Sequence, residues 1–364
     1  MSTVPDRAGL FRETLLFDWS KWSPGVAWQS TPAMAIALGL GIALGHAGAG
    51  LVAAAGAFTT GLGSLQTIRG SGLIPMLLAG VGMALSTFVG MTLGHQSLLF
   101  LLLAAIWAAG YALLTVMKGG TSWVALQWTV SLLVASAFHT SAREALGRSA
   151  MVLAGGLLQT LIAAGVQWWS RRESGAPAQA EQGFFESLGN PLACLSLRTP
   201  VCRYALRMAL VITAASEFYR HMNFVSGAWV PMTTLLVVRA DLHQTLTRGV
   251  MRVAGTILGA GLAGLVAAHL HPSPWILAGL TVFFAWWAFA VLNVNYALFT
   301  LNLTAYIVFL LGLAGLPPAA VVGRRAGYTL LGGLIALAAY PDVFVKTQRW
   351  IRVVRGEEQQ EEAA

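Results

Sequence analysis

Five polar residues interrupt the apolar second half of the sequence, namely Arg239, Asp241, Thr245, Arg248 and Arg252. Asp241 followed by Gln244 fits a capping box, which predicts that a helix begins at this point. Thr245, Arg248 and Arg252 then recur at steps of three or four and share one face of that helix. Because guanidinium groups bind carboxylates through paired hydrogen bonds, the arginines predict a vestibule for organic anions, in which Asp241 orients an arginine or takes part in gating.

A plainer interpretation of the same arginines is a membrane anchor. Basic residues at the start of a membrane helix contact lipid phosphates and mark its cytoplasmic end. Gly255 and Gly259 continue the stripe of Arg248 and Arg252 into apolar sequence, and small residues of this kind occur where helices pack closely. The stripe favours arginines that face the inside of a helix bundle, whereas the anchor interpretation places them among headgroups.

The composition is that of an integral membrane protein. Of the 364 residues 57% are hydrophobic and 10% are charged, and the mean hydropathy is +0.69, whereas a soluble domain carries about 25% charged residues. The net charge of +8 indicates loops held on the cytoplasmic face. The basic residues form no run and accompany no nucleic-acid motif, so the expected partner is a lipid bilayer and not a nucleic acid.

Twelve apolar runs are candidates for membrane helices, six on each side of a polar gap. A bilayer core needs about 20 apolar residues per helix, and several runs are shorter, the second and the eighth above all, which indicates helices that end or break inside the bundle. No apolar core follows the N-terminus closely, so no secretory signal is expected. The runs are Thr31–Gly45, Gly50–Leu65, Leu73–Leu93, Ser97–Met117, Thr121–Phe138, Ser149–Trp169, Tyr204–Phe218, Ala228–Val238, Gly249–Ala268, Trp275–Leu292, Tyr296–Gly312 and Val321–Tyr340.

The two halves resemble each other. The pair Thr59–Thr60 aligns with Thr233–Thr234, and the stretch from Gly147 aligns with the stretch from Gly323. The predicted fold is all-α and membrane-embedded, with about twelve transmembrane helices in two parallel six-helix repeats related by an axis along the membrane normal. Chance likeness between two Ala-, Gly- and Leu-rich runs is the alternative. The predicted segments are a cytoplasmic or interfacial segment (1–30), a first repeat (31–169), a cytoplasmic linker (170–202), a second repeat (203–342) and a cytoplasmic tail (343–364).

The lysines and arginines orient the chain. Most of them fall on one side if both termini are cytoplasmic, which predicts a multi-pass protein of the bacterial inner membrane. Arg148, Arg324 and Arg325 break this rule, and Arg148 and Arg324 hold matching positions in the two repeats. They predict an anion exit site on the periplasmic side, with snorkelling to headgroups as the alternative.

Two acids are candidates for carrying a coupled proton, because burial raises the affinity of a carboxylate for a proton. Glu217 ends an apolar run and Asp241 borders the next. Local pairing of Glu217 with Arg220 or His221 is the alternative.

A set of aromatic residues in the second half has two interpretations. Side chains near span ends anchor helices at the membrane interface by default. They could instead stack on an aromatic substrate. The set comprises Trp286, Trp287, Tyr296 and Phe299.

The stretch WVPMTTLLVVRADLHQTLTRGVMRVAGTILG resembles the signature of the fusaric acid resistance protein-like family of aromatic acid exporters. The resemblance is specific over 203–340 and weak over 31–170. Ala240 stands where the family has proline, only Arg69 of the arginine pattern recurs in the first half, and the large cytosolic domains of many members are not expected here. The matching residues are Trp229, Thr233, Arg239, Asp241, Thr245, Arg248, Arg252, Gly255, Thr256 and Gly259.

The resemblance implies a transporter that exports organic acids, often aromatic carboxylic acids, with or without proton coupling. A passive organic-anion channel, as among related plant proteins, and a non-transport assembly factor are the alternatives. The sequence holds no Ser/His/Asp arrangement, no H-E-x-x-H and no acidic pair at metal spacing, so no enzyme, metal site or cofactor is expected. A homo-oligomer is left open.

Overall fold

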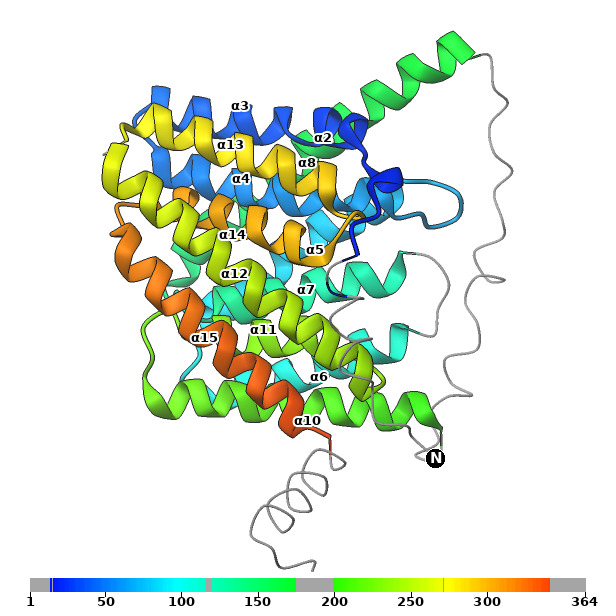
Figure 1. The fold of residues 1–364 in the computed structure, drawn as a ribbon, viewed down its shortest axis with the longest axis vertical. Coiled ribbons are helices and arrows are strands. Elements are labelled where there is room, and N and C mark those ends of the chain that lie inside the picture. Colours follow the sequence, from blue (N-terminus) through cyan, green and yellow to red (C-terminus); the bar gives the residue numbers. More distant parts are fainter. Residues whose placement is uncertain (1–13, 15, 116–119, 175–198, 271, 341–364) are drawn as a thin grey trace, which may run out of the picture.

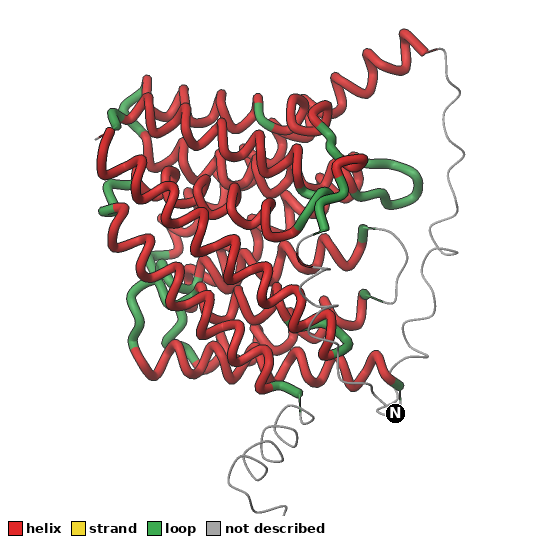
Figure 2. The backbone as a smooth tube through the Cα atoms, in the orientation of Figure 1, coloured by secondary structure: helices red, strands yellow, loops and turns green. Residues whose placement is uncertain are grey.

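The computed structural model describes residues 14, 16–115, 120–174, 199–270 and 272–340. Within these ranges all regular structure is helical, apart from one isolated bridge between Ile68 and Ser71. The helices lie side by side in one bundle (Figure 1), and the connecting loops gather at its two ends (Figure 2). The predicted all-helical class is confirmed.

Each predicted apolar run coincides with one of the helices. The first half contains α2 (Pro24–Ser30), α3 (Pro32–Ala43), α4 (Ala47–Gly61), α5 (Leu73–Leu93), α6 (Leu98–Leu114), α7 (Thr121–Ala135) and α8 (Ala142–Ser174). The second half contains α10 (Pro200–Met222), α11 (Trp229–Val237), α12 (Leu242–Leu270), α13 (Pro274–Val291), α14 (Tyr296–Leu313) and α15 (Pro318–Ala338). Short 3₁₀ helices precede α2 (Trp19–Lys21) and follow α4 (Leu62–Leu65).

Seven segments of the described chain are long and apolar enough to cross a bilayer. They are formed by α2 with α3 and by α4, α5, α8, α12, α13 and α14. Large apolar side chains point outward on these helices, with Leu85 of α5 and Leu161 of α8 more than 60% exposed. Exposed apolar surface of this extent marks a protein or membrane interface, and the length and composition of these helices match a bilayer. A multi-pass membrane protein is thus confirmed, while twelve crossings stay a prediction.

Two helices differ from the predicted runs in ways that matter for the site. α12 begins at Leu242, directly after Asp241, because the capping box starts the helix before its apolar part. α11 has nine residues, which gives a length of about 14 Å against a hydrocarbon core of about 30 Å. The predicted short eighth run is therefore a helix that ends inside the bundle.

The helices of each half pack in a corresponding order. In the first half α4 and α5 pack on α8, α5 packs on α7, and α6 packs on α7. In the second half α11 and α12 pack on α15, α12 packs on α14, and α13 packs on α14. The halves meet where α10 packs on α6 and where α13 packs on α2 and α3.

Glycines permit the closest of these crossings. Any side chain at Gly259 would strike the backbone of Leu301 on α14, and any side chain at Gly90 would strike the backbone of Leu132 on α7. Small residues let membrane helices approach to backbone contact. The glycine stripe of α12 therefore faces the interior of the bundle, as predicted.

Candidate functional site

The candidate site is built where α11 stops. Val237 and Val238 are fully buried, so the last carbonyl groups of α11 need partners away from water. Arg248 donates a hydrogen bond from Nε to the Leu236 carbonyl (2.9 Å), and Arg239 donates from Nη1 to the Val238 carbonyl (3.1 Å). The two positive side chains thus complement the negative end of the helix dipole.

Thr245 joins the turn after α11 to the first turns of α12. The backbone N–H of Arg239 donates to Thr245 Oγ1 (2.9 Å), and the Tyr340 hydroxyl lies 2.8 Å from the same atom. Tyr340 also donates to the Arg239 carbonyl. Thr245 is fully buried, so its contacts fix the position of Arg239.

Asp241 begins α12 as a capping residue. Its Oδ1 accepts a hydrogen bond from the backbone N–H of Gln244 (2.9 Å), which is the side-chain contact expected of the first residue of a capping box. Asp241 itself is exposed. A part for Asp241 in gating or proton coupling stays a prediction.

An open cavity of ≈240 Å³ lies beside this turn. The Arg248 guanidinium covers the ring of Tyr296, with Cζ 3.9 Å from the ring centroid, and Arg239 Nη1 lies 3.4 Å from the hydroxyl of Tyr111 on α6. Stacking on an aromatic face holds a guanidinium in place and leaves its edge free for a ligand. The cavity is lined by Arg239, His243, Gln244, Thr247, Arg248, Met251 and Tyr296.

Arg252 lies deeper in the bundle, one turn along α12 from Arg248. Its side chain is 2% exposed, and Nη1 donates to the Tyr296 hydroxyl at 3.4 Å. Its Nε is buried without a hydrogen-bond partner. The predicted inward stripe is therefore observed, with Thr245, Arg252, Gly255, Thr256 and Gly259 all buried.

Arg325 occupies the interior of α15. It is 2% exposed, its Cζ lies 4.0 Å from the ring centroid of Trp229 on α11, and its Nε and Nη1 have no hydrogen-bond partner. Arg324, the next residue, is half-buried and lines a very small cavity of ≈10 Å³ together with Trp229. Both arginines thus stand near Trp229, away from the start of α12.

The buried charges of the described chain are of one sign. Arg252 and Arg325 are its only buried charged side chains. The ion pairs in the same part of the chain are Lys21–Asp18, Arg148–Glu144 and Arg220–Glu217, and none of them includes a site arginine of the second half. A buried charge without a partner costs several kcal/mol of stability, so the two buried arginines indicate a functional role.

Hydroxyl groups continue from Arg252 along the contact between α12 and α14. Thr256 lies one turn beyond Arg252, and Thr300 and Thr304 lie one and two turns beyond Tyr296. All three are buried, and their Oγ1 atoms have no hydrogen-bond partner. Buried polar groups are normally satisfied, so this row marks a polar face inside an apolar bundle.

Two further predicted residues lie elsewhere and have local partners. Arg148 donates from Nη2 to Glu144 Oε1 (2.5 Å) on the same helix. Glu217 binds Arg220 through two hydrogen bonds of 2.7 Å, the local pairing that the sequence offered as an alternative. Neither residue shares a contact with Arg239, Arg248 or Arg252 within the described chain.

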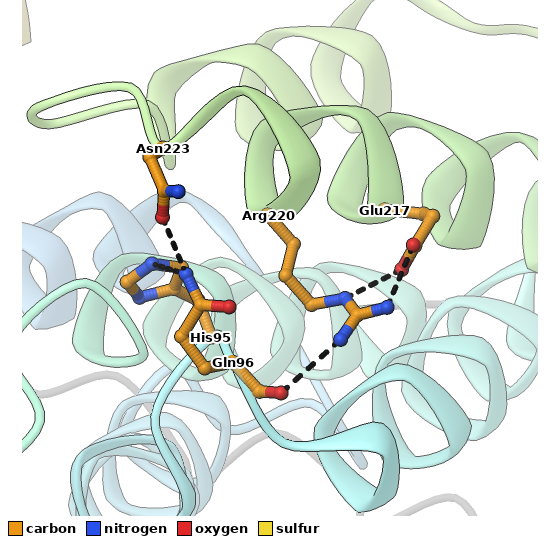
Figure 3. A network of polar contacts seen from close by, with 5 residues as sticks. All are labelled: His95, Gln96, Glu217, Arg220 and Asn223. Carbon is orange, nitrogen blue, oxygen red and sulfur yellow. Dashed lines mark hydrogen bonds and ion pairs between the residues drawn. The ribbon is translucent and has the colours of Figure 1, made fainter.

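The Glu217–Arg220 pair belongs to a polar network at the end of α10 (Figure 3). Arg220 Nη1 donates to the Gln96 carbonyl (3.4 Å), and Gln96 Nε2 donates to Asn223 Oδ1 (2.8 Å). Gln96 Nε2 also lies 3.0 Å from His95 Nε2. Because Gln96 precedes α6, this network links the first half to the second.

The aromatic candidates separate in the structure. Trp286 and Trp287 pack on Trp22, with ring centroids 5.8 and 5.2 Å apart, so they bind the segment before α2. Tyr296 alone of the four lines the cavity. Sequence reasoning missed Trp229 as the partner of Arg325, and it missed Thr300, Thr304 and Tyr340; no spacing rule connects residues so far apart in the chain.

Comparison with known proteins shows that the region of this site is similar to a family. The family model described as fusaric acid resistance protein-like matches residues 211–339. The predicted resemblance is confirmed. All of the site arginines of the second half, Arg239, Arg248, Arg252, Arg324 and Arg325, fall within the match.

Curated relatives extend the likeness. "Uncharacterized protein ORF2" of Neisseria gonorrhoeae is 30% identical over 200 residues, which is 50% of this chain and 46% of that protein. "Uncharacterized protein YhfK" of Escherichia coli is 30% identical over 142 residues, 39% of this chain and 20% of that protein. "Uncharacterized transporter YdhK" of Salmonella typhimurium is 27% identical over 107 residues, 29% of this chain and 16% of that protein.

The chain spans less than half the length of these relatives. No solved structure matches it. The chain is thus similar over residues 211–339 to the fusaric acid resistance protein-like family, has several membrane helices, and has one relative that is named as a transporter.

Proposed function

We propose that this chain exports organic acids, aromatic carboxylic acids among them, from the cytoplasm as anions. One observation carries the proposal: the buried charges of the described chain are two arginines with unpartnered N–H groups, one of them next to an open cavity lined by two more. Guanidinium groups match carboxylates in charge and in geometry. A permeating carboxylate would supply to Arg252 the partner that the chain itself does not.

The route begins at the cavity in this proposal. Arg239 and Arg248 attract the anion, and the Tyr296 ring beside them offers an apolar face for an aromatic substrate. Arg252 takes the carboxylate next, and the hydroxyls of Thr256 and Thr300 provide hydrogen bonds beyond it. Arg324 stands toward the exit with Arg325 buried beside it, and Arg148 holds the corresponding place in the first half.

Two parallel repeats complete the proposed architecture. The corresponding order of helix packing in the halves supports them. So does a matched contact: Thr60 lies beside Gly156, and Thr234 Oγ1 donates to the Gly332 carbonyl (3.0 Å). Both pairs join the second predicted helix of a half to its last. An axis along the membrane normal between the halves follows from this arrangement.

The direction of transport rests on charge. With both termini in the cytoplasm of an inner-membrane protein, the start of α12 and the cavity face the cytoplasm, where the arginines gather the acid. Asp241 and Glu217 are our candidates for carrying a proton in a coupled exchange. Both lie at helix ends, where they can meet water.

The test is transport in proteoliposomes with a panel of weak organic acids. Purified protein should accelerate benzoate flux, and Arg252→Gln should abolish it while Lys21→Gln, which removes the surface ion pair with Asp18, should not. An imposed proton gradient should drive accumulation against the benzoate gradient if the protein is a coupled carrier. Flux that only follows the benzoate gradient would identify a channel, and equal flux through wild type and Arg252→Gln would overturn the proposal.

A further inference from the structure

Arg325 itself is a buried positive charge that the proposed function does not explain. The guanidinium is 2% exposed, stacks on Trp229 at 4.0 Å and leaves Nε and Nη1 without partners. Arginine stays protonated in proteins, so it cannot escape the cost of burial by losing its proton. The charge therefore needs an anion beside it.

The neighbours of Arg325 add to the electrostatic cost of its burial and do not provide the missing anion. Arg252 on the adjacent helix α12 is close enough to repel it electrostatically, and its own Nε is also unpartnered. The exposed acids Asp241 and Glu144 lie at helix ends, and Glu217 already pairs with Arg220. No carboxylate of the described chain is buried with the two arginines.

A small cavity lies next to Trp229, the ring on which Arg325 stacks; Arg324 lines this cavity and Arg325 does not. The cavity that Trp229 and Arg324 line has a volume of ≈10 Å³, which is about the room that one water molecule needs. An aromatic acid does not fit there, whereas the cavity at Arg248 is more than twenty times larger, at ≈240 Å³. The two ends of the arginine series thus differ in what they can hold.

We infer that Arg325 binds a resident monovalent inorganic anion of halide size, chloride being the natural probe. The anion accepts from the free N–H groups of Arg325, on which Trp229 closes one face, and it screens Arg325 from Arg252. This site is separate from the cavity where we place the organic acid, and it does not depend on the chain being a transporter.

The test measures thermal stability of the full chain in detergent at constant ionic strength. Replacing gluconate with chloride or bromide should raise the Tm of the wild type in a saturable manner, because a ligand that binds only the folded state stabilises it. Arg325→Met should lose this response and should be at least as stable as the wild type in gluconate, since an apolar residue removes the buried charge. Arg220→Met, a control near the surface, should keep the response.

Several outcomes would overturn the inference. They are a wild-type Tm that is equal in gluconate and chloride, a chloride response that persists in Arg325→Met, and a response to benzoate but not to chloride, which would assign Arg325 to the organic acid. If Arg325→Met does not fold, bromide-soaked crystals of the wild type decide: an anomalous peak beside the Arg325 guanidinium supports the site, and its absence contradicts it. Loss of benzoate transport would leave these results unchanged.

Discussion

The two halves of the bundle share an order of helix packing but differ in the chemistry of their interiors. In the described part of the first half the buried polar residues are neutral, among them Thr60, Gln127 and Gln159, whereas the second half buries Arg252 and Arg325. Gln159 on α8 donates from Nε2 to the Gln29 carbonyl of α2 at 3.0 Å. The order of helix packing and the buried charge therefore vary independently. Both halves form the bundle, but only the second half buries arginines within the described chain.

The shared packing predicts the largest effect. Gly90→Val in the first half and Gly259→Val in the second should each cost about 3 kcal/mol or more, because the added side chain meets the backbone of the facing helix and the core cannot shift to admit it. Yield of monodisperse protein and Tm are the measurements. Gly261→Ala, which points into open space on α12, is the control. A Gly90→Val variant with the yield and Tm of the wild type would contradict the same close packing in both halves.

The difference in chemistry predicts the next effect. Arg248→Gln should raise the KM for benzoate by about 10–100-fold, the value of one or two hydrogen bonds to a charged group. Arg172→Gln in the first half, whose guanidinium lies 4.4 Å from the ring centroid of Trp168, should leave KM unchanged. Flux at several benzoate concentrations measures both, and equal effects of the two variants would contradict a role confined to the second half.

Tyr296→Phe should have a smaller effect. It keeps the ring beneath Arg248 and removes the hydroxyl that accepts from Arg252, so benzoate flux should fall by about 3–10-fold, the value of one hydrogen bond of about 1 kcal/mol. Tyr306→Phe on the same helix, whose ring stacks on Phe58 at 4.3 Å, is the matched control. If Tyr306→Phe loses as much flux as Tyr296→Phe, the substrate site would instead lie near the contact between the two halves.

The smallest effect is expected at Asp241. Asp241→Ala should lower stability by about 1 kcal/mol through loss of the helix cap, and Asp241→Asn should be neutral because asparagine caps equally well. Thermal unfolding and benzoate flux with and without a proton gradient measure the two roles. Asp241→Asn with a normal Tm but no gradient-driven flux would establish a coupling role in addition to the capping role.

Much of the fold follows from the sequence because apolar runs and capping residues are local signals. Asp241 and Gln244 predict the start of α12, and the small residues Gly255 and Gly259 predict which face of it is buried. The end of α8 was predicted less well. The predicted apolar run ends at Trp169, but the helix continues to Ser174. Helix formation does not require apolar residues, so the end of an apolar run need not be the end of the helix.

The site is predictable only in part for the same reason. The three arginines around α12 are close in sequence, so one pattern reveals them. Tyr296 was one of four aromatic candidates, and Trp229 was matched to the family without a role, because their contacts with arginines depend on how α11, α14 and α15 pack. Such packing is a property of the whole bundle and leaves no local pattern.

The central claim is that the polar face behind the arginines is open to water and anions, and cysteine accessibility tests it most directly. Thr256→Cys, in a background with Cys194 and Cys202 replaced by serine, should react with a membrane-impermeant anionic thiol reagent, and benzoate should slow the reaction. Ile257→Cys, whose side chain is 52% exposed on the outer surface of the same helix, should not react because lipid covers it. If Thr256→Cys is as unreactive as Ile257→Cys while Thr247→Cys in the cavity reacts, the account is contradicted.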